Sequence, residues 1–209
     1  MARALDRAAK PAAWLLGLTP LVILATGGFG VDPIETVTHL TGFWALTLLM
    51  SSLAISPLRR LTGWNGIIGA RKVLGNFAFF YAVLHFVTYL VDQSFSWGFI
   101  AADVVKHWWV TVGFAALLLL VPLALTSSQR AIRRLGKRWQ KLHRLVYVAA
   151  GLGVLHFFLL VKKDLVPPLI FAGVFAGLMA FRYELVTGKP KRGAPSVRTP
   201  RETPPVRVP

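Results

Sequence analysis

The five histidines are the side chains of this sequence best suited to redox chemistry, because the chain contains no cysteine. Without cysteine there can be no disulfide, no thiolate ligand to haem or to an iron–sulfur cluster, and no c-type haem attachment motif. Any redox cofactor must be held by histidine or without a covalent bond. His85 and His156 lie in long apolar stretches, where an ionisable side chain is costly and marks a functional site by default.

His85 and His156 are expected to stand at one depth. His85 follows Arg71 by 14 residues, and His156 follows His143 by 13. With Arg71 and His143 at the cytoplasmic starts of their helices, a rise of about 1.5 Å per residue places both inner histidines roughly 20 Å above that edge. A haem iron needs two axial nitrogens facing each other, and neutral imidazole is a common ligand. The pair predicts a bis-histidine haem near the outer leaflet; the alternative is two core histidines, each hydrogen-bonded to a neighbouring helix.

His143 and Arg71 are expected at the cytoplasmic boundary. We interpret His143 as an axial ligand of a second, inner haem, or as part of a quinone or flavin site. Arg71 stands at the matching depth, where a guanidinium can pair with a haem propionate or another anion. For both, the competing interpretation is an ordinary boundary residue. On a straight helix His143 and His156 point about 140° apart, so a haem at each requires different faces, or a distortion near Gly151 and Gly153.

The remaining histidines, His39 and His107, fall at the outer ends of their helices. Polar side chains cost little there, so we favour an interfacial role for both. Ten glycines could admit a flat macrocycle between helices, and close helix packing explains them equally well. They are Gly42, Gly63, Gly66, Gly69, Gly75, Gly113, Gly151, Gly153, Gly173 and Gly177. We find no sequence repeat.

Six apolar stretches must position the histidines. Hydrophobic residues make up 55% of the 209 residues, and the mean hydropathy is +0.59, which is more apolar than a soluble domain. Crossing about 30 Å of hydrocarbon takes roughly 20 helical residues. The stretches are residues 12–28, 39–55, 73–91, 108–125, 145–161 and 165–183. They predict an all-α fold, an integral membrane bundle of six transmembrane helices.

Positive charge sets the expected orientation. Of the 24 lysines and arginines, 21 lie in four groups. These groups are at the N-terminus, after the second stretch, after the fourth stretch, and from Arg182 onward. Both termini are therefore expected in the cytoplasm. The net charge of +16 is divided between apolar runs, which argues against a nucleic-acid partner. We expect a membrane domain over residues 1–186 and a disordered basic cytoplasmic tail over residues 187–209, which has few large apolar side chains.

Segments around the histidines resemble a known family along nearly the whole chain apart from the tail. They are residues 32–33 (DP) with 39–42 (HLTG), 71–75 (RKVLG) with 81–85 (YAVLH), and 135–143 (LGKRWQKLH) with 154–156 (VLH). The chain is similar to the MsrQ (YedZ) family, the haem-binding membrane subunits of bacterial periplasmic methionine sulfoxide reductase systems, within the ferric-reductase-like transmembrane group. The resemblance implies that His85, His143 and His156 are haem-associated. It also implies that Arg71 occupies the place of a fourth histidine in the NADPH oxidases of that group.

The resemblance also implies a task in the bacterial inner membrane. Oxidase relatives carry a cytoplasmic flavin and nicotinamide domain; this chain shows none and no dinucleotide fingerprint, so electrons are expected from elsewhere. The family implies one or two b-type haems, the quinone pool as electron donor and FMN as an associated cofactor. It implies delivery to a periplasmic molybdopterin-containing reductase (MsrP) that repairs oxidised methionines. We thus expect an electron-transfer subunit rather than the catalytic one.

Other functions stay open at this point. One is a transmembrane ferric or oxygen reductase fed by a separate cytosolic flavin reductase. The other is a transporter or a structural membrane anchor without haem. On the electron-carrier interpretation, residues 92–106 and 162–164 are docking surfaces for the periplasmic partner, and the basic residues 130–144 lie on anionic membrane lipid.

Overall fold

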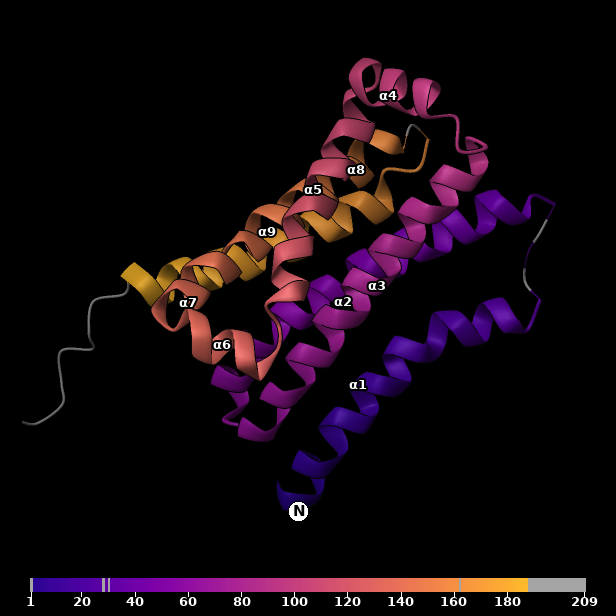
Figure 1. The fold of residues 1–209 in the computed structure, drawn as a ribbon. Helices are drawn as coiled ribbons and strands as arrows, with labels where there is room; N and C mark the ends of the chain where they lie inside the picture. The colour runs from indigo at the N-terminus through magenta and orange to yellow at the C-terminus, as the bar shows by residue number, and fades with distance from the viewer. Residues whose placement is uncertain (1, 28, 30, 162, 188–209) are drawn as a thin grey trace, which may run out of the picture.

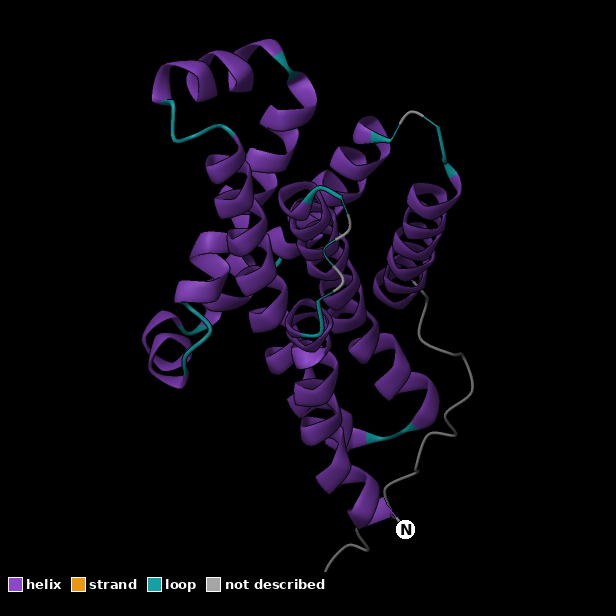
Figure 2. Ribbon diagram, turned by 90° about the vertical axis from the view of Figure 1, so that its right-hand side faces the viewer, coloured by secondary structure: helices purple, strands orange, loops and turns teal. Residues whose placement is uncertain are grey.

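The computed structural model describes residues 2–27, 29, 31–161 and 163–187. Within these ranges the chain is helical apart from turns and short loops, and no strand is present (Figure 2). Of the predicted tail, Thr187 alone falls in the described part, where it ends the last helix. The rest of the tail lies outside the described residues.

Six helical segments are long and apolar enough to cross a membrane. They are α1 (Ala2–Ala25), α2 (Pro33–Thr62), α3 (Ile68–Asp92), α5 (Trp108–Leu125), α7 with α8 (Lys137–His143 and Leu145–Leu160) and α9 (Val166–Thr187). The predicted all-α bundle of six transmembrane helices is confirmed for the described residues. A short 3-10 helix, η1 (Asn65–Ile67), precedes α3.

Helix α2 is longer than its predicted stretch because its ends are capped outside the apolar run. At the start, the Asp32 side chain accepts a hydrogen bond from the Glu35 backbone N–H at 3.0 Å, and Pro33 occupies the first helical position, where a missing N–H costs nothing. At the end, Gly63 adopts the left-handed conformation (φ 70°) and its N–H donates to the Arg59 carbonyl, a common way to stop a helix. The extra turns carry polar residues beyond the hydrocarbon.

Short helices lie between the predicted transmembrane stretches. At one end of the bundle α4 (Trp97–Lys106) joins α3 to α5, and at the other α6 (Gln129–Leu135) and α7 join α5 to α8 (Figure 1). The Ser128 side chain caps α6 by accepting from the Ala131 N–H at 3.1 Å. In α4, Trp97 and Phe99 are 68% and 57% exposed, which suits a helix lying in the membrane interface.

Two helix pairs form the centre of the bundle. Helices α2 and α3 make the most extensive contact, and α5 with α8 the next; α1 lies against α3, and α9 covers α8 and α2. The core lies between α2, α3 and α8, where Leu48, Leu53, Tyr81 and Ala150 are almost completely buried. These two pairs carry the inner histidines.

Candidate functional site

The structure brings His85 and His156 together. His85 extends from α3 and His156 from α8, and their ring centroids lie 6.2 Å apart with the ring planes at 74°. Both residues are half-buried. The two histidines thus lie at one depth, as the helical rise predicts, and their rings also face the same interior space.

Each of the two imidazoles is held by a backbone carbonyl through Nδ1. His85 Nδ1 lies 2.9 Å from the Thr38 carbonyl oxygen on α2, and His156 Nδ1 lies 2.8 Å from the Trp109 carbonyl oxygen on α5. A carbonyl oxygen only accepts, so each Nδ1 carries the proton and donates. Nε2 is then the nitrogen with a free lone pair in the neutral ring. No described residue hydrogen-bonds to either Nε2, so both are available to a metal.

The separation of the rings fits a shared haem iron. A metal–imidazole bond is about 2 Å, and the ring centroid lies about 1 Å behind the ligating nitrogen, so two axial imidazoles hold their centroids roughly 6 Å apart. The observed distance is 6.2 Å. A carbonyl partner on the second nitrogen is also the usual way in which a metal-binding histidine is oriented. The donor set thus matches the needs of a bis-histidine haem.

Two glycines allow the imidazoles to approach the helix backbones. A Cβ added at Gly42 would lie 3.0 Å from Cε1 and Nδ1 of His85, and one added at Gly113 would lie 2.7 Å from Nδ1 of His156. Each glycine comes four residues after the residue whose carbonyl binds the histidine, so the gap it leaves is beside that carbonyl. Of the ten glycines considered from sequence, these two are the ones packed against the inner histidines.

The two halves of the site repeat one another in sequence. A shift of 71 residues relates Thr38 to Trp109, Gly42 to Gly113 and His85 to His156 (109 minus 38, 113 minus 42, 156 minus 85), so that each histidine follows its carbonyl partner by 47 residues. The pair α2–α3 therefore corresponds to the pair α5–α8. Our finding of no repeat was wrong: the shared run Val-Leu-His-Phe is present at residues 83–86 and 154–157, but it is short and lies in a generally apolar sequence.

His143 occupies a separate position on α7. Its ring stacks on Trp139 at 4.0 Å between centroids, and its Nε2 lies 3.0 Å from the Thr126 hydroxyl. Trp139 Nε1 donates to the Thr126 carbonyl at 3.0 Å. The helix is interrupted at Arg144, rather than near the glycines at 151 and 153 considered from sequence.

Arg71 is likewise remote from the His85–His156 pair. Its Nη1 donates to the Ser56 hydroxyl at 3.1 Å, and the Ser52 hydroxyl donates to its carbonyl at 2.9 Å. No described hydrogen bond or ring contact joins Arg71 or His143 to the upper histidine pair. The structure thus divides the four predicted site residues into the His85–His156 pair and two residues nearer the basic end of the bundle, Arg71 and His143.

His39 and His107, the two histidines at the ends of their helices, differ from one another. His39 is exposed, with Nε2 3.5 Å from the Glu35 carboxylate, in keeping with an interfacial position. His107 instead belongs to a network that sequence reasoning missed: its Nδ1 lies 2.6 Å from Asp103 Oδ1, and the Tyr89 hydroxyl donates to Asp103 Oδ2 at 2.7 Å.

This network adjoins the histidine pair through α5. The His107 ring packs against Trp109 at 4.7 Å between centroids, and Trp109 supplies the carbonyl that binds His156. The sequence signal was the spacing of Asp103 and His107 by four residues, which places two side chains on one helix face. The network fixes the start of α5, and with it the carbonyl that orients His156.

Comparison with known proteins gives consistent matches. Residues 41–154 match the family described as "Ferric reductase like transmembrane component". That range includes Arg71, His85 and His143 and ends two residues before His156.

Curated relatives match over most of their length. The protein-methionine-sulfoxide reductase heme-binding subunit MsrQ of Rhodospirillum rubrum is 51% identical over 183 residues, covering 85% of this chain and 88% of the relative. Proteins of the same name from Ralstonia nicotianae and Xanthomonas axonopodis pv. citri are 46% and 41% identical, covering 90% and 93% of this chain and 90% and 96% of the relatives. The similarity therefore extends well beyond the histidine motifs.

Proposed function

Since the chain belongs to the ferric-reductase-like transmembrane family, and within it to the MsrQ haem-binding subunits, we propose that it binds haem b between His85 and His156 and carries electrons across the bacterial inner membrane. The acceptor is the molybdopterin-containing subunit of a periplasmic methionine sulfoxide reductase, and the donor is the quinone pool. The observation that carries the proposal is the 6.2 Å separation of two imidazoles, whose Nε2 atoms have no hydrogen-bond partner among the described residues.

The polypeptide's own contribution is to hold the two imidazoles in one protonation state and orientation. Bound haem supplies a centre that gains and loses one electron. The Thr38 and Trp109 carbonyls keep the proton on Nδ1 of each ring and make Nε2 a better donor to iron. A more basic ligand stabilises the oxidised metal, so these hydrogen bonds help to set the reduction potential. Gly42 and Gly113 let the imidazoles of His85 and His156 approach the helix backbones closely enough to form these two hydrogen bonds.

We propose that electrons enter near Arg71 and His143. Arg71 and His143 stand 14 and 13 residues below the upper histidines in the sequence, roughly 20 Å along a helix. His143 Nε2 already contacts the Thr126 hydroxyl, so ligation of a second haem through Nε2 would replace that contact. In a quinone or FMN site, His143 could keep the Thr126 contact and use Nδ1. Arg71 supplies positive charge for a propionate, a flavin phosphate or a quinone oxygen.

The same proposal assigns the two ends of the bundle. Among the described side chains, all five carboxylates lie at the end that includes α4: Asp32, Glu35, Asp92, Asp103 and Asp164. Arginines and lysines gather at the opposite end, which supports cytoplasmic termini. The periplasmic partner then meets α4 and the α8–α9 turn. Residues 1–186 form the haem-binding domain.

The proposal is tested by purifying the full-length protein and its His85→Ala and His156→Ala variants. We expect a Soret band in the wild type and loss of the bis-histidine spectrum in each variant, while His39→Ala, an exposed histidine on α2, retains it. Reduction of the wild type by a quinol, without any nicotinamide-dependent flavin reductase, supports the quinone pool as donor. Reduction only when NADPH and a flavin reductase are added would favour the ferric or oxygen reductase alternative. An unchanged spectrum in both variants would refute the haem assignment.

A further inference from the structure

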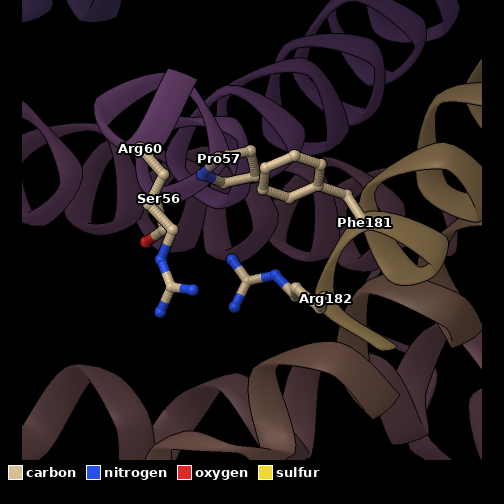
Figure 3. Close-up of a pocket in the computed structure, with 5 residues that line it drawn as sticks. All are labelled: Ser56, Pro57, Arg60, Phe181 and Arg182. Atoms are coloured by element: carbon tan, nitrogen blue, oxygen red, sulfur yellow. The ribbon is translucent and has the colours of Figure 1, made fainter. Parts of the chain in front are cut away.

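A small pocket lies between α2 and α9 at the basic end of the bundle, away from His85 and His156. It has a volume of about 40 Å³ and is lined by Ser56, Pro57, Arg60, Phe181 and Arg182. Figure 3 shows the guanidinium groups of Arg60 and Arg182 pointing toward one another, with Pro57 and Phe181 next to each other along one side of the pocket. Two cations therefore share a space that is larger than one water molecule requires, about 10–15 Å³.

Arg182 is fixed in place by the protein. Its Nη2 donates to the Leu53 carbonyl at 3.0 Å, its Nη1 donates to the Tyr147 hydroxyl, and its guanidinium carbon lies 4.6 Å from the centre of the Tyr147 ring. Its Nε is buried without a hydrogen-bond partner among the described residues. Buried donors are nearly always paired, so this one indicates an acceptor that the described residues do not supply.

Arg60 is the second cation, and it has no protein partner in the described part of the chain. Its neighbour Arg59 differs, because Arg59 Nε donates to the Asn65 side-chain oxygen at 2.7 Å. The five described carboxylates all lie at the other end of the bundle. Two guanidiniums that face each other repel, and an anion placed between them removes that repulsion and accepts hydrogen bonds from both.

The position of the pocket in the membrane indicates where that anion comes from. Arg182 lies 16 residues after Val166, the first residue of α9, or about 24 Å along the helix. In a hydrocarbon layer of about 30 Å this depth is about 6 Å short of the inner boundary, and a long arginine side chain spans that distance to the inner headgroups. Beside the pocket, α2 exposes Leu58 (40%) and Leu61 (71%), which suit acyl chains.

We propose that this pocket binds the phosphate group of an anionic phospholipid of the inner leaflet. The phosphate oxygens lie between Arg60 and Arg182, and the glycerol and upper acyl carbons pack on Pro57 and Phe181. Basic pockets between transmembrane helices on the cytoplasmic side are suited to lipid headgroups. Ser56 also accepts the hydrogen bond from Arg71, so the pocket adjoins the proposed inner site, but the proposal does not depend on haem between His85 and His156.

The test is lipid binding to the full-length, haem-loaded protein by native mass spectrometry in detergent, with phosphatidylglycerol and phosphatidylcholine of equal chain length. We expect preferential retention of phosphatidylglycerol by the wild type, and at least tenfold weaker binding to Arg60→Gln, as expected for loss of a charge-assisted hydrogen bond. Arg59→Gln removes the same charge from the adjacent residue and should bind as the wild type does. An unchanged midpoint of thermal unfolding in both variants verifies the fold.

Four results would overturn the proposal. The first is equal binding of the two lipids. The second is an equal loss in Arg59→Gln and Arg60→Gln, which would reduce the effect to general surface charge. The third is displacement of phosphatidylglycerol by millimolar inorganic phosphate or FMN, which would assign the pocket to a soluble phosphate. The fourth concerns Glu184, the carboxylate nearest to Arg182 in the sequence. If phosphatidylglycerol binds to Glu184→Gln but not to the wild type, Glu184 is the counter-ion of the two arginines.

Discussion

Replacement of Gly113 by alanine tests how closely the site is built around His156. The added methyl carbon would lie 2.7 Å from Nδ1 and 2.8 Å from Cε1 of His156. Carbon and nitrogen atoms in contact are normally about 3.5 Å apart, so the ring must move by roughly 0.8 Å. The Nδ1 hydrogen bond to the Trp109 carbonyl is 2.8 Å long. A shift of that size takes it to about 3.6 Å, where it is no longer a hydrogen bond.

The expected result is weaker haem retention with a higher reduction potential. Loss of a hydrogen bond behind a metal ligand typically lowers metal affinity about 10- to 100-fold, and the imidazole becomes a poorer donor to ferric iron. Gly42→Ala should have the same effect in weaker form, because its Cβ would lie 3.0 Å from the His85 ring and the shift needed is roughly 0.5 Å.

The assay is transfer of haem to an apo-globin acceptor, followed at the Soret band, together with a redox titration. Gly173→Ala is the matched control, because nothing lies within 4 Å of a Cβ built there and alanine favours the helix by about 1 kcal/mol. If Gly113→Ala releases haem as slowly as Gly173→Ala and titrates at the wild-type potential, the reasoning about the Trp109 carbonyl is refuted.

Two further predictions concern the ends of the bundle. Asp103→Asn weakens the hydrogen bonds to Tyr89 and His107 and should destabilise the protein by about 1.5–3 kcal/mol, which thermal unfolding shows as a lower midpoint. Asp92→Asn, at an exposed position, should leave the midpoint unchanged. Equal midpoints for the two variants would contradict the role of the network. Thr126→Val removes the hydroxyl beside His143 Nε2 and should perturb only an inner spectral or quinol-dependent component. A change confined to the signal of the His85–His156 centre would contradict the separation of the two sites.

The sequence was sufficient for the depth of the inner histidines, because helical rise is fixed and apolar length marks a membrane span. It did not reveal the Thr38 and Trp109 carbonyls, since any residue type supplies a backbone carbonyl. The glycines could be named but not ranked, because close packing and cofactor access require the same small residue. Gly42 and Gly113 were distinguished only when the structure placed each of them against an imidazole.

Helix ends and polar clusters were predicted less well than the spans. Helix α2 extends to Thr62 through Arg59 and Arg60, where hydropathy alone ends the segment near residue 55. The basic segment that follows α5 contains α6 and α7, whose short length gives little periodic signal. The sequence used Arg182 only to predict the orientation in the membrane. Its contacts could not be predicted, because Leu53 and Tyr147 lie far from it in the sequence and any residue type supplies a backbone carbonyl.

The central claim is that His85 and His156 ligate one iron, and electron paramagnetic resonance of the ferric protein tests it most directly. The ring planes meet at 74°, and nearly perpendicular axial imidazoles give a low-spin signal with one unusually large g value. We predict that signal in the wild type and its replacement by a high-spin signal, or loss of haem, in both His85→Ala and His156→Ala. Persistence of the same low-spin signal in either variant would contradict the account.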